Sequence, residues 1–175
     1  MARALADGLT ILRLVLAVVL LVLGAVYGEA AITAAVIIVM LAWFTDNLDG
    51  FLARRDPQHR PSWIGQHEFA VDVAFTWATL FYVTLSGWIP PWLAIGYTVL
   101  AAGVGFWLGR KPVTVVFLRI IDVTLWVLLL IHTPTLGLIV TVYLITLAVV
   151  KWPRLSQGVP AWARGLRDVI RGKEG

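Results

Sequence analysis

Residues 9–26 read LTILRLVLAVVLLVLGAV, a run in which Arg13 is the sole charged residue. A helix needs about 20 mainly apolar residues to cross the hydrocarbon core of a bilayer. The run is too long for the apolar part of a cleaved signal sequence, and no small-residue cleavage pattern follows it. We therefore expect residues 9–26 to form a membrane-spanning helix that is retained in the protein.

Five further apolar stretches follow, at about 30–44 and beyond, 69–88, 92–108, 113–131 and 135–150. Of the 175 residues, 60% are hydrophobic and only 14% are charged, whereas a soluble domain has about 25% charged residues. The sequence predicts an all-α integral membrane protein with six transmembrane helices. We expect a single membrane domain over 1–175, with the six spans at about 8–152 and a basic tail at 153–175.

The basic residues predict the orientation of these spans. If the N-terminus is cytoplasmic, the inner segments are 1–8, 53–68, 109–112 and 151–175, and they hold 12 of the 14 Lys and Arg residues. The three outer turns hold none, as expected when cytoplasmic loops carry the positive charge. Both termini are thus predicted to be cytoplasmic, in a cytoplasmic (inner) membrane. The net charge of +4 indicates attraction to anionic lipid, and we expect no nucleic-acid partner.

A short surface helix is expected at each end of the chain. Residues 1–8 are interpreted as lying along the membrane surface before the first span. The segment 160–171, PAWARGLRDVIR, places apolar residues on one helical face and arginines opposite, which is typical of an interfacial helix. A simple tail that stops membrane transfer is an equally good interpretation of this second segment.

Four carboxylates lie at the cytoplasmic ends of the second and third spans. Asp46 and Asp49, in TDNLDGFLARR (45–55), share a helix face at i,i+3, and Glu68 and Asp72 do so at i,i+4. The two spans are antiparallel, so Asp46 and Asp72 should face each other on the deeper side. Facing carboxylates repel one another, and a divalent cation would relieve that repulsion. The chain has no Cys, and oxygen ligands suit Mg²⁺, Mn²⁺ or Ca²⁺ better than zinc.

Small residues and an arginine adjoin these carboxylates. Gly50 and Ala53 leave the helix face bare, and Arg54 supplies donors suited to a phosphate. Together with a metal, this pattern predicts a phosphate-ester substrate. The alternative makes Gly50 a helix-packing contact and Arg54 a cytoplasmic anchor, but it leaves the clustered carboxylates unexplained.

The stretch from Asp46 to Arg54, followed by Glu68 and Asp72, resembles the signature D-x2-D-G-x2-A-R-x8-9-G-x3-D-x3-D of the CDP-alcohol phosphatidyltransferases. The first half matches at every fixed position, and residues 8–13, GLTILR, resemble the family's usual start of the first span. The second half departs from the signature twice. Ile64 occupies the expected glycine position, with Gly65 one residue later, and Glu68 replaces an aspartate.

The resemblance implies an enzyme that transfers a phosphatidyl group from a CDP-alcohol such as CDP-diacylglycerol to a small polar acceptor, releasing CMP, in phospholipid biosynthesis. It implies two divalent ions, Mg²⁺ or Mn²⁺, held by Asp46, Asp49 and Glu68, with Asp72 as a ligand or the general base. Gly50, Ala53 and Arg54, with Asp46, would border the CDP group. The resemblance also implies a homodimer, with the active site facing the cytoplasm.

The acceptor site is less closely specified. Arg110, Lys111 and Arg119 lie at or near the cytoplasmic ends of the fourth and fifth spans, where they would suit an acidic acceptor such as glycerol 3-phosphate or another alcohol phosphate. Arg119 also forms an i,i+3 pair with Asp122. A buried ion pair that orients the fifth span is an equally good interpretation.

Two functions of other classes remain open. A cation transporter would use intramembrane carboxylates, but the outer halves of the spans carry few polar groups to form a path. A non-catalytic relative that binds lipid or nucleotide agrees with the departures at Ile64 and Glu68. Formation of CMP from CDP-diacylglycerol separates these alternatives from the enzyme.

Overall fold

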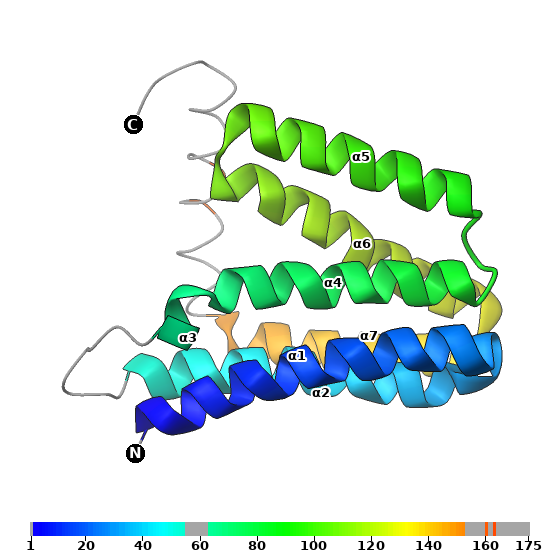
Figure 1. The fold of residues 1–175 in the computed structure, drawn as a ribbon. Helices are drawn as coiled ribbons and strands as arrows, with labels where there is room; N and C mark the ends of the chain where they lie inside the picture. Colours follow the sequence, from blue (N-terminus) through cyan, green and yellow to red (C-terminus); the bar gives the residue numbers. More distant parts are fainter. Residues whose placement is uncertain (1, 55–62, 153–159, 161–162, 164–175) are drawn as a thin grey trace. The chain divides into compact units, whose positions relative to one another are not determined.

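The computed structural model describes residues 2–54 and 63–152, together with residues 160 and 163. Every regular element in this part of the chain is a helix (Figure 1). The elements are α1 (Ala2–Tyr27), the 3₁₀ helix η1 (Gly28–Ala31), α2 (Ile32–Arg54), α3 (Trp63–Gln66), α4 (Glu68–Leu85), α5 (Pro91–Leu108), α6 (Lys111–His132) and α7 (Pro134–Val150). The all-α prediction is therefore confirmed for the described residues.

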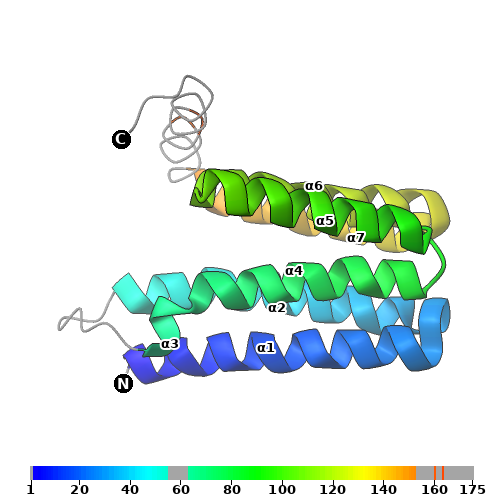
Figure 2. The ribbon, with the colours of Figure 1, turned by 45° about the horizontal axis from the view of Figure 1, so that its top comes forward.

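Four segments are long and apolar enough to cross a membrane: Ala4–Leu48, Glu68–Leu85, Pro91–Leu108 and Lys111–His132. The first contains both α1 and α2, which turn back at η1 and pack side by side (Figures 1 and 2). The apolar helix α7, with 17 residues, is shorter than these segments. The apolar helices indicate an integral membrane protein, while the count of six spans and the orientation of the termini stay predictions.

Residues 2–8 are helical but do not form a separate helix, and their predicted place along the membrane surface stays a prediction. Helix α1 begins at Ala2 and continues without a break to Tyr27, because no proline interrupts residues 2–8. Its 26 residues extend over about 39 Å at 1.5 Å per residue, which exceeds the roughly 30 Å of a hydrocarbon core. One helix can therefore provide both the span and its surface end. The predicted interfacial helix at 160–171 and the basic tail at 153–175 lie outside the described residues, apart from residues 160 and 163.

The chain divides into two compact units, Met1–Ala94 and Ile95–Gly175. In the first unit, α1 is the central helix, because α2 and α4 both pack mainly against it. Gly24 of α1 allows a close approach to α4, since a Cβ at this position would lie 3.2 Å from the Cα of Tyr82. The Tyr82 hydroxyl donates a 3.0 Å hydrogen bond to the carbonyl of Gly28, where α1 ends. These contacts hold the C-terminal end of α1 against the C-terminal end of α4.

The second unit contains the rest of α5 together with α6 and α7. The Tyr97 hydroxyl of α5 donates to the carbonyl of Phe117 at 2.6 Å. Trp126 Nε1 of α6 donates to Thr141 Oγ1 of α7 at 2.8 Å. A Cβ on Gly137 of α7 would lie 2.8 Å from backbone atoms of Leu130, so the absence of a side chain is required for this helix contact.

Candidate functional site

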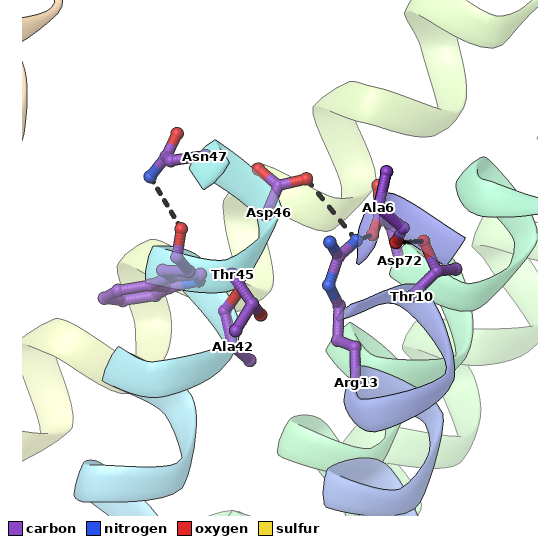
Figure 3. A network of polar contacts seen from close by, with 9 residues as sticks. Ala6, Thr10, Arg13, Ala42, Thr45, Asp46, Asn47 and Asp72 are labelled. Carbon is purple, nitrogen blue, oxygen red and sulfur yellow. Dashed lines mark hydrogen bonds and ion pairs between the residues drawn. The ribbon is translucent and has the colours of Figure 1, made fainter. Parts of the chain in front are cut away.

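Three helices of the first unit contribute charged side chains to one place. Arg13 lies in the first half of α1, Asp46 in the second half of α2, and Asp72 in the second turn of α4. Because α1 packs between its two partners, the arginine lies between the two carboxylates. Figure 3 shows the Arg13 guanidinium directed at both of them.

A single guanidinium nitrogen contacts both carboxylates. Arg13 Nη1 lies 3.4 Å from Asp46 Oδ1 and donates a hydrogen bond to Asp72 Oδ1. The Arg13 side chain is only 2% exposed, whereas those of Asp46 and Asp72 are 44% and 31% exposed. The arginine is therefore enclosed by the helices, and the carboxylates remain accessible from outside.

The arrangement confirms one expectation and corrects another. Asp46 and Asp72 are neighbours in space, as the antiparallel spans predicted. The two carboxylates were expected to lack a positively charged partner in the protein, but the guanidinium of Arg13 contacts both of them. The sequence did indicate a role for Arg13, because an ionisable residue inside an apolar run normally marks a site or a buried pair. The sequence interpretation applied that rule to the carboxylates and not to Arg13.

The neutral polar side chains around this cluster bond within their own helices. Thr10 and Thr45 are buried and donate to carbonyl oxygens of Ala6 and Ala42, at 3.3 and 2.9 Å. Asn47 Nδ2 donates to the carbonyl of Trp43 at 2.6 Å. Figure 3 includes these bonds. The threonine hydroxyls and this amide thus have backbone acceptors of their own, and Arg13 supplies the ion pairs given for the carboxylates in the described part of the chain.

Glu68 is the first residue of α4, one turn before Asp72. The i,i+4 spacing on one helix is therefore confirmed, and Asp72 interacts electrostatically with Glu68 as well as with Arg13 and Asp46. The chain bends at His67, whose amide donates to the carbonyl of Ile64 at 2.9 Å. The short helix α3 and this bend occupy the segment in which the sequence departs from the family signature.

The remaining residues of the signature belong to the last turns of α2. The backbone is helical through Asp49, Gly50, Ala53 and Arg54, which confirms that Asp46 and Asp49 are i,i+3 on one helix. The side chains of these four residues lie outside the described part of the structure. Their predicted roles at the metal and the CDP group stay predictions.

A divalent metal is implied by the resemblance. Among the side chains that the structure describes, no group of three or more His, Asp or Glu residues is arranged to hold a metal ion. The chemistry of the donors nevertheless fits Mg²⁺ or Mn²⁺, because Asp46, Glu68 and Asp72 offer only carboxylate oxygens. Their partial exposure leaves these oxygens open to a cation.

The three basic residues predicted for the acceptor all belong to the second unit. Arg110 precedes α6 in an extended conformation, and Lys111 is its first residue. Arg119 Nη1 lies 2.7 Å from Asp122 Oδ2, which confirms the predicted i,i+3 pair. The Arg119 side chain is 69% exposed and that of Asp122 is 16% exposed. A purely structural ion pair was expected to be buried, whereas the Arg119 side chain is largely exposed.

Comparison with known proteins supports the resemblance. A family model described as CDP-alcohol phosphatidyltransferase matches residues 3–164, which includes both halves of the signature and nearly all of the described helices. Members of this family generally depend on divalent metal ions. Searches of curated proteins and of solved structures gave no significant match. Because the family model extends over most of the chain, this protein belongs to the CDP-alcohol phosphatidyltransferase family.

Proposed function

We propose that this protein transfers the substituted phosphate group of a CDP-alcohol lipid, such as CDP-diacylglycerol, to the hydroxyl of a small polar acceptor and releases CMP. The main observation behind this proposal is the meeting of Asp46 and Asp72 at Arg13, in a chain that belongs to the phosphatidyltransferase family. A site at the end of apolar helices suits this substrate, whose acyl chains stay in the bilayer while the cytidine group faces water.

The side chains of the signature have distinct roles in this proposal. Asp46, Asp49 and Glu68 would hold two divalent ions, Mg²⁺ or Mn²⁺, together with Asp72. Bound metal ions supply charge neutralisation for the diphosphate and for the departing CMP. Gly50 and Ala53 leave room for the CDP group, and Arg54 donates hydrogen bonds to its phosphates.

Asp72 is the proposed general base. Its carboxylate accepts the proton of the acceptor hydroxyl as the acceptor oxygen forms a bond to phosphorus, and the bond from phosphorus to the CMP oxygen breaks. The carboxylate is 31% exposed, so a bound hydroxyl can reach it. The contact with Arg13 restrains the orientation of this side chain, which a general base requires.

The acceptor is proposed to carry a negative charge. Arg110 precedes α6, Lys111 is its first residue, and the guanidinium of Arg119 is exposed on the same helix. An alcohol phosphate such as glycerol 3-phosphate offers oxygens that match these donors. If Arg119 binds this group, Arg119→Gln should raise the KM for the acceptor by about tenfold with little change in kcat, because the interaction is made before the reaction as well as during it.

Release of CMP in detergent tests the proposed function. Purified protein is incubated with radiolabelled CDP-diacylglycerol and, in separate reactions, with glycerol 3-phosphate, inositol phosphate, serine or phosphatidylglycerol. One acceptor should yield CMP and a new lipid, the activity should vanish with EDTA, and added Mg²⁺ or Mn²⁺ should restore it. Undiminished turnover in excess chelator would contradict the metal site. Absence of CMP with every acceptor would favour the non-catalytic relative.

The cytoplasmic orientation is part of the same proposal. A cysteine introduced at Glu29, beside the turn between α1 and α2, should react with an impermeant thiol reagent added outside the cell. A cysteine at Gln58, in the predicted inner loop, should react only after the membrane is opened. Because the chain has no natural Cys, the labelling has no background, and the reverse pattern would place the site at the opposite face.

A further inference from the structure

The buried position of Arg13 has a consequence for metal binding. Its Nη1 atom contacts the Oδ1 atoms of both Asp46 and Asp72. These two carboxylates are also the ones expected to bind a divalent ion. The same two carboxylates therefore have two cationic partners in this proposal, the metal ion and the guanidinium of α1.

We propose that Arg13 is a positioning residue that acts as an internal counter-cation, holding Asp46 and Asp72 together before metal binds and competing with the metal for their oxygens. This inference rests on the proposed function, because it takes these carboxylates to be metal ligands. Arg13 itself is not assigned a contact with the substrate. Its effect is exerted through the two carboxylates.

Arg13 and a metal ion would approach the carboxylates from different sides. Arg13 reaches them from inside the helix packing and is 2% exposed, while Asp46 is 44% exposed and Asp72 is 31% exposed. A metal ion arriving from water can reach the carboxylates without passing the arginine. The guanidinium cannot leave, because its helix is packed against both α2 and α4. Binding of metal thus has to weaken the contacts with Arg13 without displacing α1.

The charges explain why both cations are needed. Without Arg13, Asp46 and Asp72 would place two like charges near each other, and these charges repel. One guanidinium compensates one of these charges, and Glu68 adds another negative charge one turn away on α4. Taken over the side chains that the structure describes here, one positive and three negative charges leave a net negative charge that attracts a divalent ion. Arg13 keeps Asp46 and Asp72 from separating while no metal is bound.

The test compares Arg13→Met, which keeps an unbranched side chain without charge, with the wild-type protein and Leu20→Ala. Leu20 is on the same helix and fully buried, so its truncation lowers stability by leaving a cavity and removes no charge. Binding of Mn²⁺ is measured by electron paramagnetic resonance, and the melting temperature is followed by tryptophan fluorescence in EDTA and in Mn²⁺.

Arg13→Met should melt at a lower temperature than the wild type in EDTA and should recover most of that loss in saturating Mn²⁺. Its Kd for Mn²⁺ should fall by about tenfold, because freeing the carboxylates of the arginine favours metal binding by more than the lost positioning disfavours it. Leu20→Ala should lose stability equally with and without Mn²⁺ and keep the wild-type Kd. Unchanged or weaker Mn²⁺ binding by Arg13→Met would overturn the inference, as would a wild-type protein that binds no Mn²⁺.

Arg13→Lys provides a second variant if Arg13→Met does not fold. The lysine keeps the charge but lacks the planar fork of donors, so the protein should stay folded in EDTA and bind Mn²⁺ more tightly than the wild type. Weaker binding by this variant contradicts competition. CMP release distinguishes the two proposals. Tighter Mn²⁺ binding by the Arg13 variants, without CMP release by the wild type, would contradict the proposed function alone. CMP release by the wild type, with weaker Mn²⁺ binding by the variants, would contradict the role of Arg13 alone.

Discussion

The two units place charge inside apolar helices in different ways. In the first, Arg13 of α1 contacts carboxylates of α2 and α4 and is almost fully buried. In the second, Arg119 and Asp122 pair within one turn of α6, and the arginine is 69% exposed. The first group exists only when three helices pack together, whereas a single helix is enough to form the second.

The difference indicates how each group responds to change. Removing a member of the Arg13 cluster leaves a buried or partly buried charge without its partner, which strongly lowers the stability of the folded protein. Removing Asp122 from the Arg119 pair leaves a charge that is largely exposed. We therefore expect activity and stability to depend strongly on the first group and weakly on the second.

The largest expected effect separates the two aspartates. Asp72→Asn should lower kcat for CMP release by about 10²–10⁴-fold, because it removes the proposed base and a carboxylate of the cluster. Asp122→Asn, the same chemical change in the second unit, should lower kcat by less than about tenfold, since Asp122 is neither a proposed metal ligand nor the proposed base. Equal decreases in kcat in the two variants would contradict the expected difference between the Arg13 cluster and the Arg119 pair.

Substitutions at Glu68 test whether a further carboxylate of the first unit is required for activity. Glu68→Gln should lower activity by at least about 10–100-fold if a carboxylate is required at this position, because glutamine keeps the size but not the charge. Glu68→Asp restores the residue of the family signature and should keep substantial activity. The measurement is CMP release as a function of Mg²⁺ concentration. Full activity and unchanged metal dependence in Glu68→Gln would mean that the site uses Asp46, Asp49 and Asp72 alone.

The helix contact at Gly137 tests the packing of the second unit. Gly137→Ala should lower the free energy of unfolding by about 1–3 kcal/mol, as overpacking does, because the new Cβ would lie 2.8 Å from the backbone of Leu130. Gly96→Ala is the matched control, since nothing lies within 4 Å of its Cβ. Thermal unfolding in detergent compares the two. A neutral Gly137→Ala would show that α6 and α7 can separate slightly without loss.

The smallest expected effect concerns the stability of the Arg119 pair. Polar contacts between residues of membrane helices contribute on average about 0.6 kcal/mol, and the exposure of Arg119 favours a value no larger than this. A double-mutant cycle with Arg119→Gln and Asp122→Asn measures the coupling directly. A coupling energy above about 2 kcal/mol would show that this pair is as firmly held as the cluster around Arg13.

Much of the helical structure could be predicted from hydropathy. The predicted third, fourth, fifth and sixth spans agree with α4 to α7 to within a few residues. The pairs at i,i+3 and i,i+4 were equally accessible, because helical periodicity places such residues on one face. The continuity of α1 through residues 2–8 was not predicted, because Arg3, Asp7 and Gly8 set this segment apart from the apolar run that follows. The sequence also contained no direct sign of the bend at His67.

The sequence by itself determined the apolar helices, the carboxylates of the family signature and the pairing of Arg119 with Asp122, because each depends on residues within one helix or on composition. The tertiary structure alone decided that Arg13 lies between Asp46 and Asp72. Those partners are 33 and 59 residues away along the chain, and their contact depends on which helix occupies the centre of the first unit. Hydropathy shows that α1, α2 and α4 are apolar, but their order in the packing follows from close approaches such as that of Gly24 to Tyr82.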